Sequence, residues 1–148
     1  MSLPLIHSTS DNNDDLSVLT LNVHYNSSLL SPSGDANGFS AIENTFSNSL
    51  LDDGDNKDKD PLTDKIVQLS WVDLASEFTS GELPASLGTL RFKKGDQAIE
   101  PLTEEGLNTN VRYTASGTAT DYGFLTGNTT LEAKPFSLDG DGLMVIVS

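Results

Sequence analysis

The chain has 148 residues, with 22 acidic and 8 basic side chains, a formal charge of −14 and no cysteine. One hydrophobic core suffices for a chain of this length, so we expect a single domain. The charge repels polyanions, which argues against nucleic acid or anionic lipid as partners. The lack of cysteine excludes disulfides and cysteine-based metal sites but leaves the compartment open.

No apolar run approaches the roughly 20 residues that a transmembrane helix needs, so membrane insertion is not expected. The N-terminus has neither the basic region nor the hydrophobic region of a signal peptide. We interpret residues 1–3, "MSL", as a cloning remnant and residues 4–148 as the domain, and we expect it to be part of a larger protein.

The first apolar segment, "LPLIH", is a candidate edge strand within a region of turn composition. The clearest strand is "LSVLTLNVHY", residues 16–25, where apolar and polar residues alternate as in a sheet with one buried face. His24 falls on the polar side, so we expect it to face solvent. The residues expected to point inward are Leu19, Leu21, Val23 and Tyr25.

Residues 31–48 mix Gly, Asn and Ser with isolated apolar residues, which predicts a long connection or one weak strand. The segment "KIVQLSWVD" then gives a second alternating strand with Val67, Leu69 and Trp71 inward. We expect it to pair with "ASLGTLRFKK", where Leu90 and Phe92 point inward and Arg91 and Lys93 outward.

Four further short strands are predicted at "NVRYTAS", "DYGFLT", "TTLEAKPFSL" and "LMVIVS", each bounded by Gly, Asn, Pro or Asp. No segment has a long 3.6-residue apolar stripe, so helix should be minor. The pattern predicts an all-β chain, an antiparallel β-sandwich or jelly roll.

The acidic run "LLDDGDNKDKDPLTDK", residues 50–65, has too little apolar content to pass through a core and must lie on the surface. Clustered carboxylates favour calcium. The run does not fit an EF-hand, because Lys57 occupies the third ligand position. A solvated loop that confers solubility is the alternative, and the sequence leaves both open. The candidate calcium ligands are Asp52, Asp53, Asp58, Asp60 and Asp64.

Exposed aromatic side chains can serve as sugar-binding platforms. Trp71, the single tryptophan, is in phase with Val67 and Leu69, which favours a core position. Tyr113, Tyr122 and Phe124 are better candidates for a sugar-binding face because they lie in or beside Gly- and Thr-rich turns, although packing explains them more simply.

Catalytic groups have only weak support in the sequence. Asp73 with Glu77 or Glu82 would supply the carboxylate pair of a glycosidase, but a turn hydrogen bond explains Asp73 more simply. His7 and His24 are too few and too far apart in sequence to suggest a zinc site or a catalytic triad.

Three stretches resemble the cohesin-like modules of large bacterial surface and secreted proteins. "LTLNVHYNSSLL" is similar to their opening strand and turn. "DDGDNKDKDPLTDKIVQLSWVDLASEFTSGELPASLGTLRFKK" resembles their acidic loop, Trp-x-Asp strand, "LP" turn and following strand. "VRYTASGTATDYGF" and "PFSLDGDGLMVIVS" resemble the end of the domain and its junction with a dockerin-like repeat.

The junction departs from the family pattern. "SLDGDGLMVIVS" passes from Asp139 and Asp141 directly into an apolar segment, without the loop of calcium-ligand spacing. This truncated junction argues against a dockerin-type calcium site at Asp139.

The resemblance implies a jelly-roll sandwich of about nine strands and no catalysis. The leading hypothesis is an extracellular or cell-surface module for adhesion or protein–protein assembly, with calcium as the candidate ion of the acidic loop and a dockerin-like module or a second copy as the candidate partner. The alternative is a carbohydrate-binding module of the same architecture, with a polysaccharide as its ligand. Partner choice does not follow from the fold.

Overall fold

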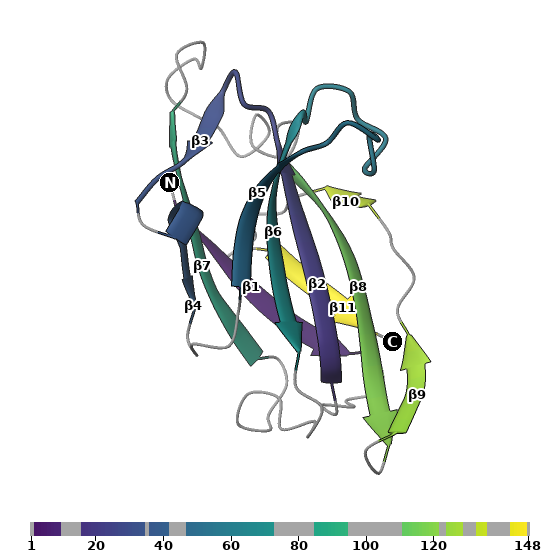
Figure 1. Cartoon of the computed structure of the whole chain (residues 1–148). Coiled ribbons are helices and arrows are strands. Elements are labelled where there is room, and N and C mark those ends of the chain that lie inside the picture. The colour runs from purple at the N-terminus through teal and green to yellow at the C-terminus, as the bar shows by residue number, and fades with distance from the viewer. Residues whose placement is uncertain are drawn as a thin grey trace.

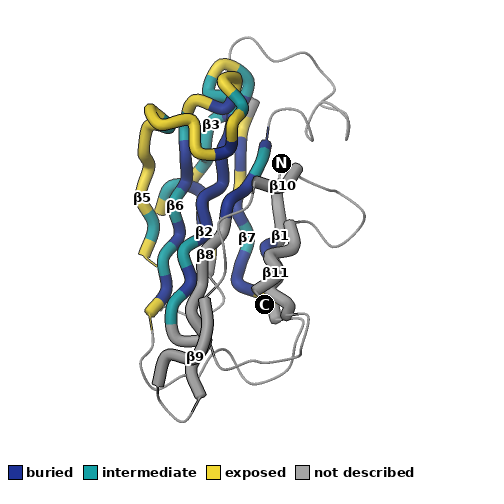
Figure 2. The backbone as a smooth tube through the Cα atoms, turned by 90° about the vertical axis from the view of Figure 1, so that its right-hand side faces the viewer, coloured by how far each residue is buried: buried dark blue, intermediate teal, exposed yellow. Residues whose placement is uncertain are grey.

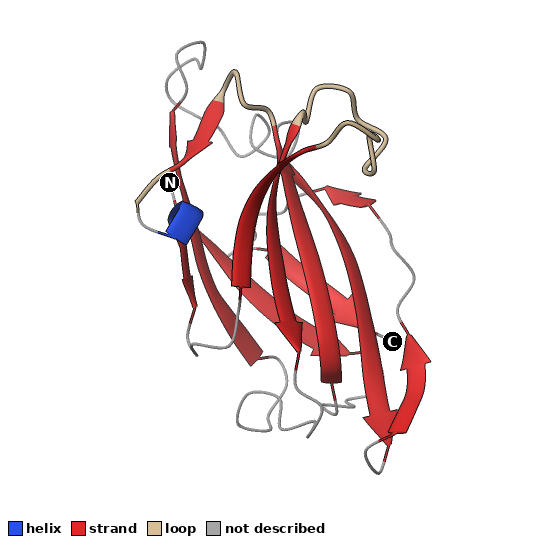
Figure 3. Ribbon diagram, viewed as in Figure 1, coloured by secondary structure: helices blue, strands red, loops and turns tan. Residues whose placement is uncertain are grey.

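The computed structural model describes residues 2–9, 16–34, 36–41, 47–72, 85–94, 111–121, 124–128, 133–135 and 143–147. Side chains are described for residues 5, 18–34, 36–40, 47–72, 86–93 and 111–114. These residues form two β-sheets, which lie over one another in Figures 1 and 3. The expected all-β class with mostly antiparallel strands is confirmed.

The first sheet has the strand order β10-β8-β2-β6-β5, with β9 also paired to β8. Strand β2 lies at its centre and pairs antiparallel with both β6 and β8. The strands are β2 (Leu16–Tyr25), β5 (Ser47–Asp52), β6 (Lys65–Val72), β8 (Val111–Asp121), β9 (Phe124–Asn128) and β10 (Ala133–Pro135).

The second sheet has the order β11-β1-β7-β3, with β4 also paired to β7. Strands β1 and β11 run parallel, whereas the other described pairs are antiparallel. The strands are β1 (Ser2–Thr9), β3 (Leu30–Pro32), β4 (Phe39–Ala41), β7 (Ala85–Lys94) and β11 (Leu143–Val147).

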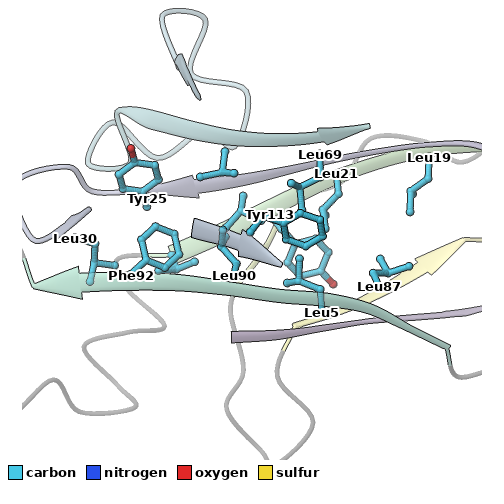
Figure 4. Packing of buried hydrophobic residues seen from close by; sticks show 14 of the residues in the cluster. Leu5, Leu19, Leu21, Tyr25, Leu30, Leu69, Leu87, Leu90, Phe92 and Tyr113 are labelled. Carbon is cyan, nitrogen blue, oxygen red and sulfur yellow. The ribbon is translucent and has the colours of Figure 1, made fainter. Parts of the chain in front are cut away.

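The core lies between the two sheets and takes residues from both (Figure 4). Alternation in β2 and β6 places every second side chain there, as predicted for Leu19, Leu21 and Val23. Tyr25 meets Phe92 of the second sheet with ring centroids 5.2 Å apart. The remaining core residues are Leu5, Leu30, Phe39, Val67, Leu69, Trp71, Leu87, Leu90, Val111 and Tyr113.

Two expectations about strand neighbours were wrong. Strand β6 pairs with β2 and β5, not with β7, which lies in the other sheet. The inward direction of Leu90 and Phe92 and the exposure of Arg91 and Lys93 were nevertheless correct, because alternation is independent of the partner strand. The "LPLIH" segment is no edge strand, since β1 lies between β11 and β7.

Residues 31–48 contain more structure than one weak strand. They include the end of β3, the 3-10 turn η1 (Ala36–Gly38), β4 and the start of β5. Gly38 has φ +80, and its Cα lies so close to the main chain of β7 that a Cβ would meet the Arg91 carbonyl oxygen at 2.4 Å. In the described part of the chain, no helix is long and apolar enough to cross a membrane.

Candidate functional site

The acidic loop, residues 53–64, joins β5 to β6 of the first sheet. The loop and β5 consist mostly of exposed residues, which are yellow in Figure 2. Asp53 N donates to the Asp64 carbonyl oxygen at 2.9 Å and closes the base of the loop. The expectation of a surface loop is confirmed for most residues, but Asp58 and Thr63 are buried at 1% exposure each.

Aspartate carboxylates build the turns of the acidic loop. Asp53 Oδ1 accepts from Lys57 N at 3.0 Å, Asp58 Oδ1 from Asp60 N at 3.1 Å, and Asp60 Oδ1 from Leu62 N at 3.0 Å. Aspartate is common in turns because its carboxylate can accept a hydrogen bond from a main-chain N–H a few residues later in the chain. The density of aspartates therefore has a structural cause that needs no bound cation.

His24 connects the loop to the sheet. It sits on the face of β2 opposite to the core, and its side chain is fully buried. Nδ1 lies 2.9 Å from Asp53 Oδ2 and 4.0 Å from Asp58 Oδ2, both on buried side chains. The expectation of a solvent-facing histidine was wrong, because the acidic loop provides partners for the polar face of a central strand.

Asp58 lies between the loop and β8. Its Oδ2 accepts a short hydrogen bond from Thr63 Oγ1 and lies 4.0 Å from Arg112 Nε. Arg112 Nη1 lies 3.9 Å from Asp60 Oδ2, and the buried Nε atom of Arg112 has no hydrogen-bond partner. The guanidinium thus approaches two carboxylates without a direct hydrogen bond from Nε to either.

A row of polar side chains crosses three strands beneath the loop. Gln68 Nε2 donates to Asn22 Oδ1 at 3.0 Å, Asn22 Nδ2 donates to Thr114 Oγ1 at 3.2 Å, and Thr114 Oγ1 lies 2.9 Å from His24 Nε2. Register explains the row, since Asn22 is opposite both Gln68 and Thr114. Buried polar groups of this kind stabilise a fold only when each has a partner.

One tautomer of His24 is compatible with all of these contacts. An ionised carboxylate can only accept, so a proton on Nδ1 would join His24 to Asp53. Thr114 Oγ1 can accept from Asn22 and donate its own proton to His24 Nε2.

Thr114, His24 and Asp53 have the connectivity of a hydroxyl–imidazole–carboxylate triad, with both distances at 2.9 Å. A triad must also leave its hydroxyl open to a substrate. Thr114 is 2% exposed and His24 is fully buried, so a substrate carbonyl cannot reach the hydroxyl in this conformation. We interpret the row as structural.

The five predicted calcium ligands do not converge. The structure brings Asp53 and Asp58 together around His24, and it places Asp60 beside Arg112. The other two carboxylates are exposed and have other partners: Asp52 pairs with Lys65, and Asp64 accepts from Ser27.

The pKa of Asp64 reflects its partners. Partial burial raises it, but the hydrogen bonds from Ser27 Oγ at 2.6 Å and Ser27 N at 2.8 Å outweigh burial, and the pKa of Asp64 lies below its ordinary value. The hydrogen bond from Lys65 to Asp52 raises the pKa of that lysine. Burial raises the pKa of Tyr25, which lies next to Lys65 on the neighbouring strand.

Among the described strands, β5 is an edge strand of the first sheet, and it exposes two leucines. Leu50 is 48% exposed and Leu51 38% exposed. Together with Tyr25, Asp52 and Lys65 they line an open recess of about 200 Å³. Apolar and charged side chains thus line the recess together at the edge of a sheet, where unpaired main-chain groups can join another strand.

The remaining sequence candidates lie elsewhere. Trp71 and Tyr113 are core residues, as packing predicted. Tyr122, Asp73, Glu77, Glu82, Asp139 and Asp141 lie outside the described residues, as do the side chains of His7 and Phe124.

Comparison with known proteins gives no relative. No protein-family model, curated protein or solved structure matches the chain.

Proposed function

We propose that the chain is a non-catalytic binding module of a bacterial surface or secreted protein, a jelly-roll β-sandwich of about nine strands that mediates protein–protein assembly. The observation that carries the proposal is the edge of β5, where Leu50 and Leu51 are exposed beside the recess. Their side chains alternate, so the strand presents apolar surface on both sides. Folded proteins usually protect such edges, which makes an unprotected one a candidate interface.

The charge distribution indicates the chemistry of the partner. A chain with a charge of −14 repels a second acidic surface and attracts a basic one. A dockerin-like module with basic residues around an apolar contact fits this edge better than a second copy of the chain.

The carbohydrate-binding alternative needs exposed aromatic side chains. The two described candidates, Trp71 and Tyr113, are buried in the core at 2% and 8% exposure. Protein binding at β5 is therefore the better-supported of the two functions.

Binding of the full chain to immobilised dockerin-like modules, to itself and to a glycan array tests the proposal. We expect a protein complex that weakens at least tenfold in Leu50→Lys, since a lysine would bury a charge at the interface. Val72→Lys is the matched control, because Val72 is exposed on the adjacent strand but does not line the recess. Glycan binding without protein binding, or equal effects of the two variants, would contradict the proposal.

Calcium binding by the acidic loop stays a prediction. A thermal melt in calcium and in chelator tests it, because an ion that binds only the native state raises the melting temperature. An unchanged melting temperature would exclude a stabilising calcium ion.

A further inference from the structure

The buried group formed by His24, Asp53 and Asp58 has the composition of a metal site. One ligand atom from each residue lies within 4.8 Å of the others, and all three side chains are fully buried. The residues come from the end of β2 and from two turns of the acidic loop, so a bound ion would cross-link the loop to the sheet.

The donor atoms select the class of ion. Calcium takes six to eight oxygen ligands and does not favour an imidazole nitrogen. One imidazole and two carboxylates suit zinc and similar divalent transition metals. Tetrahedral zinc with bonds of about 2.1 Å requires ligand atoms roughly 3.4 Å apart. The Nδ1 atom of His24 lies 2.9 Å from Asp53 Oδ2 and 4.0 Å from Asp58 Oδ2, so shifts of well under 1 Å would bring both pairs to that spacing.

Charge supports a dication independently of the donor geometry. Asp53, Asp58 and Asp60 provide three carboxylates beside the single guanidinium of Arg112. Buried charge without a counter-charge is unfavourable, and a divalent ion would offset the excess of carboxylates. Arg112 is 31% exposed and keeps Asp60 as its partner, so it need not leave the site.

The second shell is also present. A metal-bound histidine usually donates its other ring N–H to a fixed acceptor, which orients the ring. Thr114 Oγ1 lies 2.9 Å from His24 Nε2 and would accept that proton once the metal occupies Nδ1. A metal ion at Nδ1 would displace any proton from that atom, so the ring proton of the metal-bound imidazole would reside on Nε2.

We propose that His24 Nδ1, Asp53 and Asp58 bind a divalent transition-metal ion of the zinc class, and that Thr114 Oγ1 orients the imidazole by accepting a hydrogen bond from Nε2. Neither the assembly function nor the edge of β5 is needed for this site, so its failure would leave that proposal intact.

Calorimetric titration of the full chain with Zn²⁺ and with Ca²⁺ is the first test. We expect one Zn²⁺ per chain, and at least tenfold weaker Zn²⁺ binding in Asp58→Asn. Thr114→Val should weaken Zn²⁺ binding 10- to 100-fold, as the loss of second-shell partners does elsewhere. Asp52→Asn is the matched control, since it removes the same charge from an exposed carboxylate that pairs with Lys65. No binding of Zn²⁺, equal binding in Asp58→Asn, or displacement of Zn²⁺ by equimolar Ca²⁺ would overturn the proposal.

The tautomer of His24 gives a readout that needs no variant. The chain has only two histidines, so long-range nitrogen–proton NMR spectra can resolve His24 from His7. Without metal the proton should reside on Nδ1, and with Zn²⁺ it should move to Nε2. This experiment decides the question even if Asp58→Asn fails to fold, because Zn²⁺ binding that leaves Nδ1 protonated would refute the site.

Discussion

His24 Nδ1 lies 2.9 Å from Asp53 Oδ2, so one imidazole near the end of the central strand β2 holds the first turn of a loop 29 residues further along the chain. The contact is buried on both sides. Its loss would leave a carboxylate and a threonine hydroxyl without their partner, and each unsatisfied buried polar group costs about 1–3 kcal/mol.

We therefore expect His24→Ala to lower the free energy of unfolding by about 2–4 kcal/mol. Urea denaturation at neutral pH measures this change. Asp52→Ala serves as the control, because Asp52 is an exposed residue of the same loop region and its loss should leave the midpoint unchanged. A His24→Ala midpoint equal to that of the parent chain would show that the imidazole does not hold the loop.

Alternation along β6 predicts that truncating two apolar residues of this strand will lower the free energy of unfolding by very different amounts. Leu69 is fully buried, so Leu69→Ala should cost about 2–5 kcal/mol through lost packing and the cavity left behind. Val72 is 62% exposed, and Val72→Ala should change the stability by less than about 0.5 kcal/mol. Equal effects in a denaturation experiment would mean that β6 has a different register.

Gly38 marks a close approach between η1 and β7. A Cβ there would meet the Arg91 carbonyl oxygen at 2.4 Å, and the φ of +80 also disfavours alanine. Gly38→Ala should therefore destabilise the chain by about 1–3 kcal/mol. Gly54→Ala is the matched control, because no atom lies within 4 Å of its Cβ position. The melting temperature of Gly38→Ala should lie clearly below that of Gly54→Ala. Equal melting temperatures would argue against the close contact between Gly38 and the main chain of β7.

Asp64 should make stability depend on acid pH. Its pKa in the folded chain lies below its unfolded value of about 3.9, because Ser27 donates two hydrogen bonds to the ionised form. The stabilisation is complete above the unfolded pKa and disappears as the pH falls through the folded pKa. Ser27→Ala removes the hydroxyl donor, so its stability should decrease less between neutral and acid pH. Parallel pH profiles for both chains would contradict this assignment.

Local patterns predicted much of the fold. Period-two alternation gave the inward faces of β2, β6 and the second half of β7, because a strand with one buried face must alternate. Pairing could not be read in the same way. The apolar faces of β6 and β7 are compatible with one shared sheet or with two separate sheets, and the structure places the two strands in separate sheets.

The buried polar cluster was missed for a related reason. A polar face is normally solvated, so the sequence predicts an exposed His24. Only the three-dimensional position of the acidic loop reveals that Asp53 and Asp58 lie against this side chain. A usable signal was present nevertheless: Asn, His and Thr on the polar faces of two central strands are hydrogen-bonding residues without charge, which suit a covered polar surface better than lysine or glutamate would.

The pairing of β2 with β8 has a consequence for the order in which the chain folds. Its cross-strand contacts join residues about 90 positions apart, as between His24 and Thr114, whereas β5, the acidic loop and β6 form a local hairpin. Non-local pairing requires closure of a long chain segment and slows folding. The hairpin can therefore form early in folding. The imidazole is fixed between Asp53 and Thr114 only when β8 pairs with β2, so formation of the buried polar row indicates that folding is complete.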